Sequence, residues 1–253
     1  MKTLRFDSLQ VLQHPGRVAL GTDAGERVAA AIGAAIAARG EARVIFACAP
    51  SQNEFLAALT SLPVDWAKVV AFHMDEYVSL QDTHPASFRS FLREHLLAHI
   101  SAPRAVHFIH AEAPPDREAA RYSALLAERP IDLVCLGIGE NGHLAFNDPP
   151  VADFHDPAAV KVVALDEACR RQQVHDGCFV SLETVPTHAL TLTIPALMNA
   201  REISCVVPGP RKAAAVRDAL LGPIRASCPA SILRTHPRAA LHIDDDAASL
   251  LPK

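Results

Sequence analysis

Residues 131–150 read IDLVCLGIGENGHLAFNDPP, and this stretch decides how the rest of the chain is interpreted. Its first six residues form a mostly apolar run that is typical of a buried strand. Gly137, Gly139 and Gly142 then fall within six residues. Because glycine lacks a Cβ, such a backbone can approach a ligand closely. A glycine-rich turn at the carboxyl end of a strand is where an open α/β sheet places its chemistry.

Strand-like and helix-like runs alternate along the whole chain. We expect strands at 42–47, 68–73, 131–136, 161–164, 189–192, 202–207 and 239–243. We expect helices at 24–39, 52–59, 87–99, 115–128, 166–173, 194–199 and 211–221. This alternation predicts a doubly wound α/β fold, with a mostly parallel sheet and helices on both faces. No linker or composition break divides the chain, so we expect residues 1–253 to form a single domain.

The composition narrows the classes of function. A formal net charge of −4 argues against a broad nucleic-acid surface, although local basic residues could still hold a small anion. We expect no membrane span and no signal segment, since the chain has no suitable apolar run. The six cysteines include no Cys-x-x-Cys pair, and reduced thiols favour the cytoplasm. Cys48, Cys135 and Cys205 are expected to be small core residues.

Asp75 and Glu76 follow the predicted strand at 68–73. A carboxylate pair at the carboxyl end of a strand can place a general base beside a substrate carbon. The pair could equally cap a helix or form a salt bridge, so these residues alone leave both interpretations open.

His143 follows the last of the three glycines, and Asp148 stands five residues further on. A nearby carboxylate would fix the tautomer of the imidazole. The glycines and Asn141 favour a functional histidine over one that only bonds the backbone. The Gly-x-Gly-x-x-Gly spacing also occurs in dinucleotide sites, but the prolines at 149–150 interrupt the long helix that such a site requires. We therefore expect no dinucleotide.

Lys212 lies in the segment Pro208-Gly209-Pro210-Arg211-Lys212, directly after the strand at 202–207. A lysine at the amino end of a helix, beside free backbone N–H groups, is suited to bind a phosphate. A solvated surface lysine is the alternative. Together, the three strand ends describe an acid–base enzyme for a phosphorylated small molecule.

The chain contains 13 histidines, which raises the question of a metal. His95 and His99 have the spacing of two zinc ligands on one helix face. They lack the adjoining glutamate of the metalloprotease motif and lie far in sequence from the three strand ends. We therefore predict no metal and no cofactor.

These segments resemble the glucosamine-6-phosphate deaminase/isomerase family, which is related to the 6-phosphogluconolactonases. Residues 72–77, FHMDEY, are similar to the family's Phe-Asn-Met-Asp-Glu-Tyr motif. Residues 137–148 resemble its Gly-x-Gly-x-Asp-Gly-His-x-Ala-Phe-Asn-Glu motif, and residues 209–213 its Gly-x-x-Lys-Ala phosphate site. The likeness covers about residues 42–245, and the Phe-Asn pair at 146–147 favours the deaminase branch.

The resemblance implies a cofactor-free isomerisation of an aldose to a ketose, coupled to loss of ammonia. The small-molecule partner would be an amino-sugar phosphate, with glucosamine 6-phosphate as the first candidate. His143 would move the proton that opens the sugar ring, and Asp75 would carry a proton from C2 to C1. Asp148 and Asn141 complete the expected catalytic set. The expected substrate contacts are Ser51, Gln52, Glu76, Gly142, Lys212, and Arg170 or Arg171 in place of the family's phosphate-site arginine.

The chain departs from the family pattern in three places. Asn141 stands where many members have an acid, Asp148 stands where glutamate is common, and residues 47–52 read ACAPSQ where deaminases carry Thr-Gly-Gly-Thr. Without those glycines the backbone embraces a phosphate less closely. Two alternatives therefore stay open: hydrolysis of a sugar-phosphate lactone, and a sugar-phosphate-binding regulator without catalysis. The sequence also leaves the oligomeric state open, a homo-oligomer included.

Overall fold

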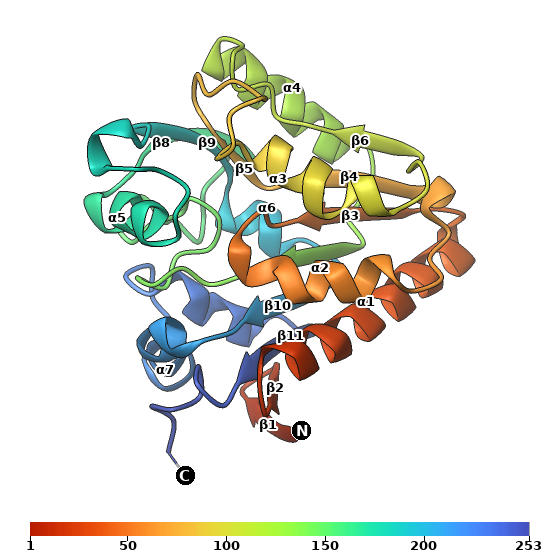
Figure 1. Cartoon of the computed structure of the whole chain (residues 1–253), viewed down its shortest axis with the longest axis vertical. Coiled ribbons are helices and arrows are strands. Elements are labelled where there is room, and N and C mark those ends of the chain that lie inside the picture. Colours follow the sequence, from red (N-terminus) through yellow and green to blue (C-terminus); the bar gives the residue numbers. More distant parts are fainter. Residues whose placement is uncertain (253) are drawn as a thin grey trace.

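The computed structural model describes residues 1–252, and its main element is an eight-stranded sheet (Figure 1). Neighbouring strands in this sheet are parallel, apart from the antiparallel pair at one edge. In spatial order the strands are β1 (Lys2–Phe6), β2 (Leu9–His14), β11 (Ala239–Asp244), β10 (Glu202–Val207), β7 (Leu133–Leu136), β3 (Ala42–Phe46), β4 (Val69–His73) and β6 (Ala105–His107).

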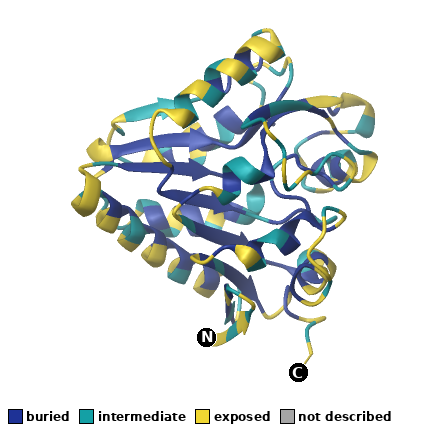
Figure 2. Ribbon diagram, turned by 180° about the vertical axis from the view of Figure 1, so that it is seen from behind, coloured by how far each residue is buried: buried dark blue, intermediate teal, exposed yellow. Residues whose placement is uncertain are grey.

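Helices pack on both faces of this sheet. One face is covered by α1 (Arg17–Arg39), α2 (Asn53–Thr60) and α3 (Phe88–His95), and the other by α4 (Pro115–Ala127), α6 (Ile194–Met198) and α7 (Ala213–Leu221). Side chains along one strand alternate between the two cores, because successive residues of a strand point to opposite faces. The six strands between the two edge strands β1 and β6 are accordingly buried along most of their length (Figure 2). These two layers of helices confirm the predicted doubly wound fold.

A second, antiparallel sheet of three strands lies beside the carboxyl edge of the first. Its order is β5 (Asp75–Tyr77), β9 (His188–Leu192) and β8 (Val160–Ala164). Since only Met74 separates the end of β4 from the start of β5, the chain passes almost directly from one sheet into the other. The remaining long helix, α5 (Glu167–His175), follows β8.

The amino-terminal segment differs from the prediction. A hairpin of β1 and β2, for which no strand was predicted, turns at Asp7 with a left-handed φ of 53°. The first helix begins at Arg17, seven residues before the predicted start at Ala24. No side chain caps this helix after Gly16, so the usual amino-terminal signal is missing.

The order of the strands fixes where a ligand can bind. From β3 the chain proceeds outward to β4 and β6, and then returns to β7 on the other side of β3. The loops after β3 and β7 therefore diverge and leave a crevice between them, which is the usual binding position in open α/β sheets. Among residues 1–252, we find no helix with the length and apolar character needed to cross a bilayer.

Candidate active site

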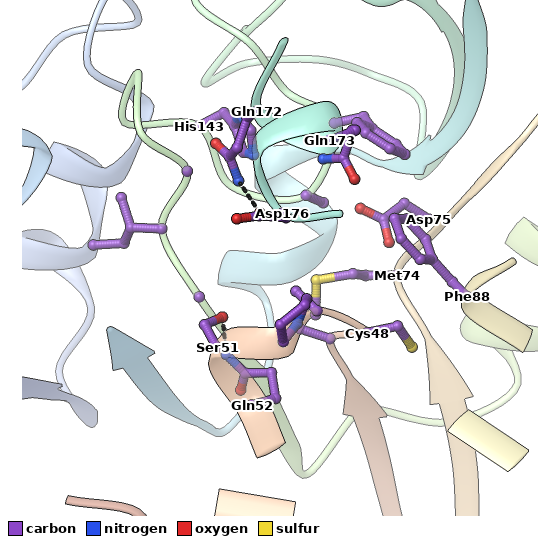
Figure 3. A pocket seen from close by; sticks show the side chains of 18 of the residues that line it. Cys48, Ser51, Gln52, Met74, Asp75, Phe88, His143, Gln172, Gln173 and Asp176 are labelled. Carbon is purple, nitrogen blue, oxygen red and sulfur yellow. Dashed lines mark hydrogen bonds between the residues drawn. The ribbon is translucent and has the colours of Figure 1, made fainter. Parts of the chain in front are cut away.

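A pocket occupies this crevice, at the position where open α/β sheets usually bind small molecules. Its walls come from the loop after β3, the junction of β4 and β5, the loop after β7, helix α5 and the turn that contains Lys212. In Figure 3 the side chains of Asp75, His143 and Ser51 surround the same cavity from different elements. The three strand ends singled out in the sequence thus meet at one place.

Asp75 is a buried acid in the wall of this pocket, with 7% of its surface exposed. It is the first residue of β5 and pairs in register with Thr191 of β9. Burial raises the pKa of Asp75 well above its ordinary value, and the neighbouring charge of Glu76 raises it further. A carboxylate with a raised pKa is a stronger base than an exposed aspartate.

The imidazole of His143 lies directly against the backbone of Gly139. A Cβ added at Gly139 would lie 2.3 to 2.5 Å from three ring atoms of His143, so only glycine fits there. The turn is closed by two backbone hydrogen bonds, from Gly139 N to His143 O and from Gly142 N to Gly139 O, both 3.0 Å. Gly139 is therefore needed to let the imidazole lie against the backbone.

Asp148 and Asn141 hold the other side of the imidazole. Nδ1 of His143 lies 2.7 Å from Oδ1 of Asp148. The Asn141 amide donates to the same carboxylate at 2.9 Å, and its carbonyl oxygen accepts from the His143 backbone N–H at 3.1 Å. Burial acts to raise the pKa of Asp148, but the contacts with His143 and Asn141 outweigh it and lower that pKa. Asn141 thus holds His143 and Asp148 in position through its two hydrogen bonds. Because Nδ1 of His143 faces Asp148, Nε2 is the nitrogen that can face a substrate.

Lys212 lies in the pocket wall formed by the turn Pro210–Lys212. Burial is the main cause of a lowered pKa for its ammonium, and Arg211 acts in the same direction, while Asp176 and Glu140 oppose it. Lys212 and Ser51 also border a second hollow that adjoins the pocket. The Gln52 side chain bonds Ser51 Oγ at 3.1 Å and the Val206 carbonyl at 3.3 Å, which fixes the loop after β3.

Arg17 lines the same second hollow, and sequence reasoning missed it. Its guanidinium forms two hydrogen bonds with Glu54, of 2.7 and 3.0 Å, and 42% of its side chain is exposed. An arginine at the amino end of a helix opposes the helix dipole, and this was the signal that could have revealed it. The same reasoning had already identified Lys212.

Glu76 does not line the pocket, although the sequence analysis placed it among the substrate contacts. Its carboxylate is fully buried and accepts hydrogen bonds from Ser87 Oγ and from the backbone N–H groups of Phe88 and Arg89. The Arg89 guanidinium also donates to it at 3.2 Å. Glu76 therefore anchors the start of α3 and the position of β5.

Three further residues predicted as substrate contacts also lie outside the pocket. The Arg170 guanidinium donates to the carbonyls of Leu182 and Val185, and Arg171 forms an exposed pair with Glu167 one helical turn away. Gly142, with a φ of 85°, turns the loop rather than facing the pocket. The structure thus brings neither arginine to the pocket, and the arginines that border the adjoining hollow are Arg17 and Arg211.

Helix α5 contributes side chains that no sequence pattern distinguished. Gln172 and Gln173 line the pocket, and Gln172 Oε1 accepts a hydrogen bond of 2.8 Å from the Glu140 backbone N–H. Cys48 lines the pocket on the side of β3 and is 4% exposed. The three cysteines predicted to be small core residues are all buried.

Comparison with known proteins identifies the family. Residues 15–242 match the model of the family described as glucosamine-6-phosphate isomerases/6-phosphogluconolactonase. The chain is 40% identical over 188 residues to a glucosamine-6-phosphate deaminase of Exiguobacterium sibiricum, covering 74% of this chain and 73% of the relative. It is 36% identical over 214 residues to that of Listeria monocytogenes, covering 84% and 89%.

Solved structures agree with these matches. A monomeric glucosamine-6-phosphate deaminase superimposes with a TM-score of 0.87 at 28% identity, covering 95% of this chain and 99% of that one. A 6-phosphogluconolactonase from Shewanella baltica has a TM-score of 0.75 at 19% identity, covering 92% and 96%, and shares the fold. From its motifs, its pocket and these relatives, the chain belongs to the glucosamine-6-phosphate isomerase/6-phosphogluconolactonase family.

Proposed function

We propose that this protein is an enzyme that isomerises and deaminates an amino-sugar phosphate, with glucosamine 6-phosphate as the first substrate. The products are a ketose phosphate and ammonia. The observation that carries this proposal is the buried Asp75 carboxylate in the same pocket as the His143–Asp148 pair. Lactone hydrolysis needs a water molecule activated by His143 but no base for a C2 proton. That reaction would therefore give Asp75 no chemical role.

The first step is opening of the sugar ring, assigned to His143. Asp148 and Asn141 orient the imidazole, so that Nε2 can take the proton of the C1 hydroxyl and pass it to the ring oxygen. The open chain carries an aldehyde at C1 and an amine at C2. The aldehyde makes the C2 proton acidic enough for a carboxylate to remove.

Asp75 carries out the isomerisation. Its carboxylate takes the C2 proton, which gives an enolamine with the negative charge on O1, and returns that proton to C1. A proton of the C2 nitrogen then passes to O1, which leaves a C1 hydroxyl and an imine at C2. Water adds to the imine, and ammonia leaves as the C2 carbonyl forms. A single base can serve both carbons because C1 and C2 are adjacent, and the raised pKa of Asp75 suits a group that must both accept and return a proton.

The phosphate is assigned to the end of the pocket formed by Lys212 and Ser51. Lys212 supplies a positive charge in a half-buried position, where an ion pair with phosphate is screened less by water than at an exposed site. Arg17 lies beside the adjoining hollow and would join the phosphate if Glu54 released it. These three side chains compensate for the missing glycines of the loop after β3.

The deciding experiment offers the purified enzyme glucosamine 6-phosphate and, separately, 6-phosphogluconolactone. We expect ammonia and a ketose phosphate from the first substrate. Asp75→Asn should lower kcat by about 10²–10⁴-fold and leave the affinity for the substrate within a few fold. Asp65→Asn, which alters an acid on the surface, serves as the control. Lactone turnover without ammonia release would reverse the assignment, and binding without any turnover would favour the regulator.

A further inference from the structure

Three side chains from distant parts of the sequence meet beneath the first turns of α1. His14 is the last residue of β2, His242 lies in β11, and Asp23 lies in α1, which packs against both strands (Figure 1). His14 is 3% exposed, His242 is fully buried and Asp23 is 22% exposed. None of them lines the candidate active site. No spacing in the sequence joins these positions, so only the fold reveals the cluster.

The distances within this cluster are too long for good hydrogen bonds. Nε2 of His14 lies 3.5 Å from Oδ2 of Asp23, and Nδ1 of His242 lies 3.3 Å from the same oxygen. Well-formed N–H···O bonds are about 2.7–3.2 Å long. In a tetrahedral zinc site, two ligand atoms bound at about 2.1 Å are about 3.4 Å apart. The separations therefore suit ligands that share an ion.

The ring nitrogens also lack other partners. Nε2 of His14 and both nitrogens of His242 are buried without a hydrogen bond among residues 1–252. Leaving buried polar atoms unpaired costs free energy, and native proteins pair nearly all of them. A bound cation would pair with one nitrogen of each ring and with the carboxylate at once.

We propose that His14, Asp23 and His242 form a binding site for Zn²⁺ or a similar divalent transition-metal ion. Two imidazoles and one carboxylate are a common donor set for such ions, whereas Mg²⁺ and Ca²⁺ prefer oxygen ligands. Water would complete the coordination, since His242 borders a groove that runs along α1. The bound ion would join α1 to β2 and β11, and so stabilise the fold.

Arg27 competes with the proposed ion for the carboxylate of Asp23. Its Nε donates to Oδ2 of Asp23 at 2.8 Å, the oxygen that the metal would take. With 43% of its side chain exposed, Arg27 can turn into solvent or move to the other carboxylate oxygen. Replacing Arg27 should therefore leave metal binding at least as tight as in the wild type, whereas replacing Asp23 or His14 should weaken it.

A second set of possible ligands must be separated in the test. His143, Asp148 and Cys169 also lie close enough to hold an ion, but they belong to the candidate active site. His95 and His99, the pair with zinc-like spacing, lie elsewhere: the ring of His95 stacks on Phe91 with centroids 4.0 Å apart. His143→Ala therefore removes the active-site ligand and leaves the proposed site intact.

The test titrates the full-length protein, first stripped with a chelator, with ZnCl₂ in a calorimeter. Visible absorption of added CoCl₂ reports the coordination geometry. We expect one ion per chain in the wild type and in His143→Ala, and at least a tenfold weaker affinity in Asp23→Asn and in His14→Gln. Arg27→Gln should bind at least as tightly as the wild type. ZnCl₂ should raise the Tm of the wild type and not that of Asp23→Asn.

Two results would overturn the proposal. One is the absence of zinc binding by the wild type. The other is binding that persists unchanged in Asp23→Asn and His14→Gln, which would place the ion elsewhere, and in the pocket if it also disappears in His143→Ala. Far-ultraviolet circular dichroism checks that each variant is folded, and either Asp23→Asn or His14→Gln suffices for the comparison.

Discussion

At the scale of single residues, the loop after β7 depends on close contact between the His143 side chain and the backbone of Gly139. Gly139 and Gly137 stand two positions apart in this loop, yet an added methyl group would meet different neighbours. At Gly139 it would overlap the imidazole of His143, whereas at Gly137 its nearest neighbour is the flexible amide of Gln52, at 3.1 Å. The two glycines thus have separate roles in the site.

Gly139→Ala should therefore displace His143 and lower kcat/KM by about 10²-fold, because small misplacements of catalytic groups cost that much. Gly137→Ala is the matched control and should have a much smaller effect, since the end of the Gln52 side chain can move. Steady-state kinetics with glucosamine 6-phosphate measures both. Equal losses of kcat/KM in the two variants would contradict the proposal that Gly139 in particular makes room for the imidazole of His143.

Lys212→Ala should raise KM for the phosphorylated substrate by about 10–100-fold, because a charge-assisted contact contributes about 1.5–3 kcal/mol. Turnover of unphosphorylated glucosamine, however slow, should not change. Lys68→Ala removes an exposed lysine and controls for the loss of one positive charge. An unchanged KM for the phosphorylated substrate would remove the phosphate role from Lys212.

The pH profile should report Asp75. Its pKa is raised above 3.8 by burial and by Glu76, and only the ionised carboxylate can take a proton. Activity should therefore fall on the acid side at a pH above the ordinary aspartate range. Measuring kcat/KM against pH at two temperatures tests this. A carboxyl group ionises with little enthalpy, so the acid limb of the pH profile should hardly move with temperature. A limb at the ordinary aspartate value, or one that shifts strongly with temperature, would argue for another group.

At the scale of the elements, α1 and α2 approach each other through glycine. A Cβ at Gly21 would lie 2.6 to 2.7 Å from atoms of Glu54, two of them backbone atoms, and backbone cannot easily give way. Gly33, further along the same helix, is exposed and has nothing within 4 Å of an added Cβ. One helix therefore contains both a glycine required by packing and one that is not.

Gly21→Ala should destabilise the protein by about 1–3 kcal/mol, because overpacking outweighs the gain in helix propensity. Gly33→Ala should stabilise it by up to about 1 kcal/mol, since alanine favours a helix over glycine. Urea unfolding measures both free energies. A neutral Gly21→Ala would mean that the two helices can separate without cost.

The sequence predicted the central elements well because their apolar runs are continuous. The strand at Glu202–Val207 has the predicted bounds, and Val69–His73 differs by one residue. It missed the hairpin at the amino terminus, where β1 is mostly exposed and carries no such run. In the site, strand ends placed Asp75 and His143, but the direction of Glu76 depends on Ser87 and Arg89, which only the folded chain brings near.

At the scale of the whole molecule, the stability of the fold is linked to pH through a buried histidine. His73 stands where the family motif has asparagine, and its Nε2 accepts a hydrogen bond of 2.8 Å from the Ile109 backbone N–H. Burial is the main cause that lowers its pKa to about 3, and Arg89 contributes. The folded protein therefore keeps this imidazole neutral at pH values where the unfolded chain protonates it.

Stability should accordingly be lost as the pH falls below 6.5 toward 3, since the unfolded state then binds the extra proton. Over about two pH units this amounts to about 2–3 kcal/mol. His73→Asn should remove that part of the acid sensitivity, whereas His155→Asn, on the surface, should not. Urea unfolding at neutral and mildly acidic pH gives the difference, and identical acid sensitivity in wild type and His73→Asn would contradict it.

The position of β11 has a consequence for synthesis of the protein. This strand, near the end of the chain, lies between β10 and β2 and pairs with both. While the ribosome is still making residues 239–244, the β1–β2 hairpin has emerged but has no strand to join it to the rest of the sheet. The hairpin thus leaves the ribosome well before the strand that joins it to the sheet, and any chain terminated before Ala239 is left with two unconnected edges.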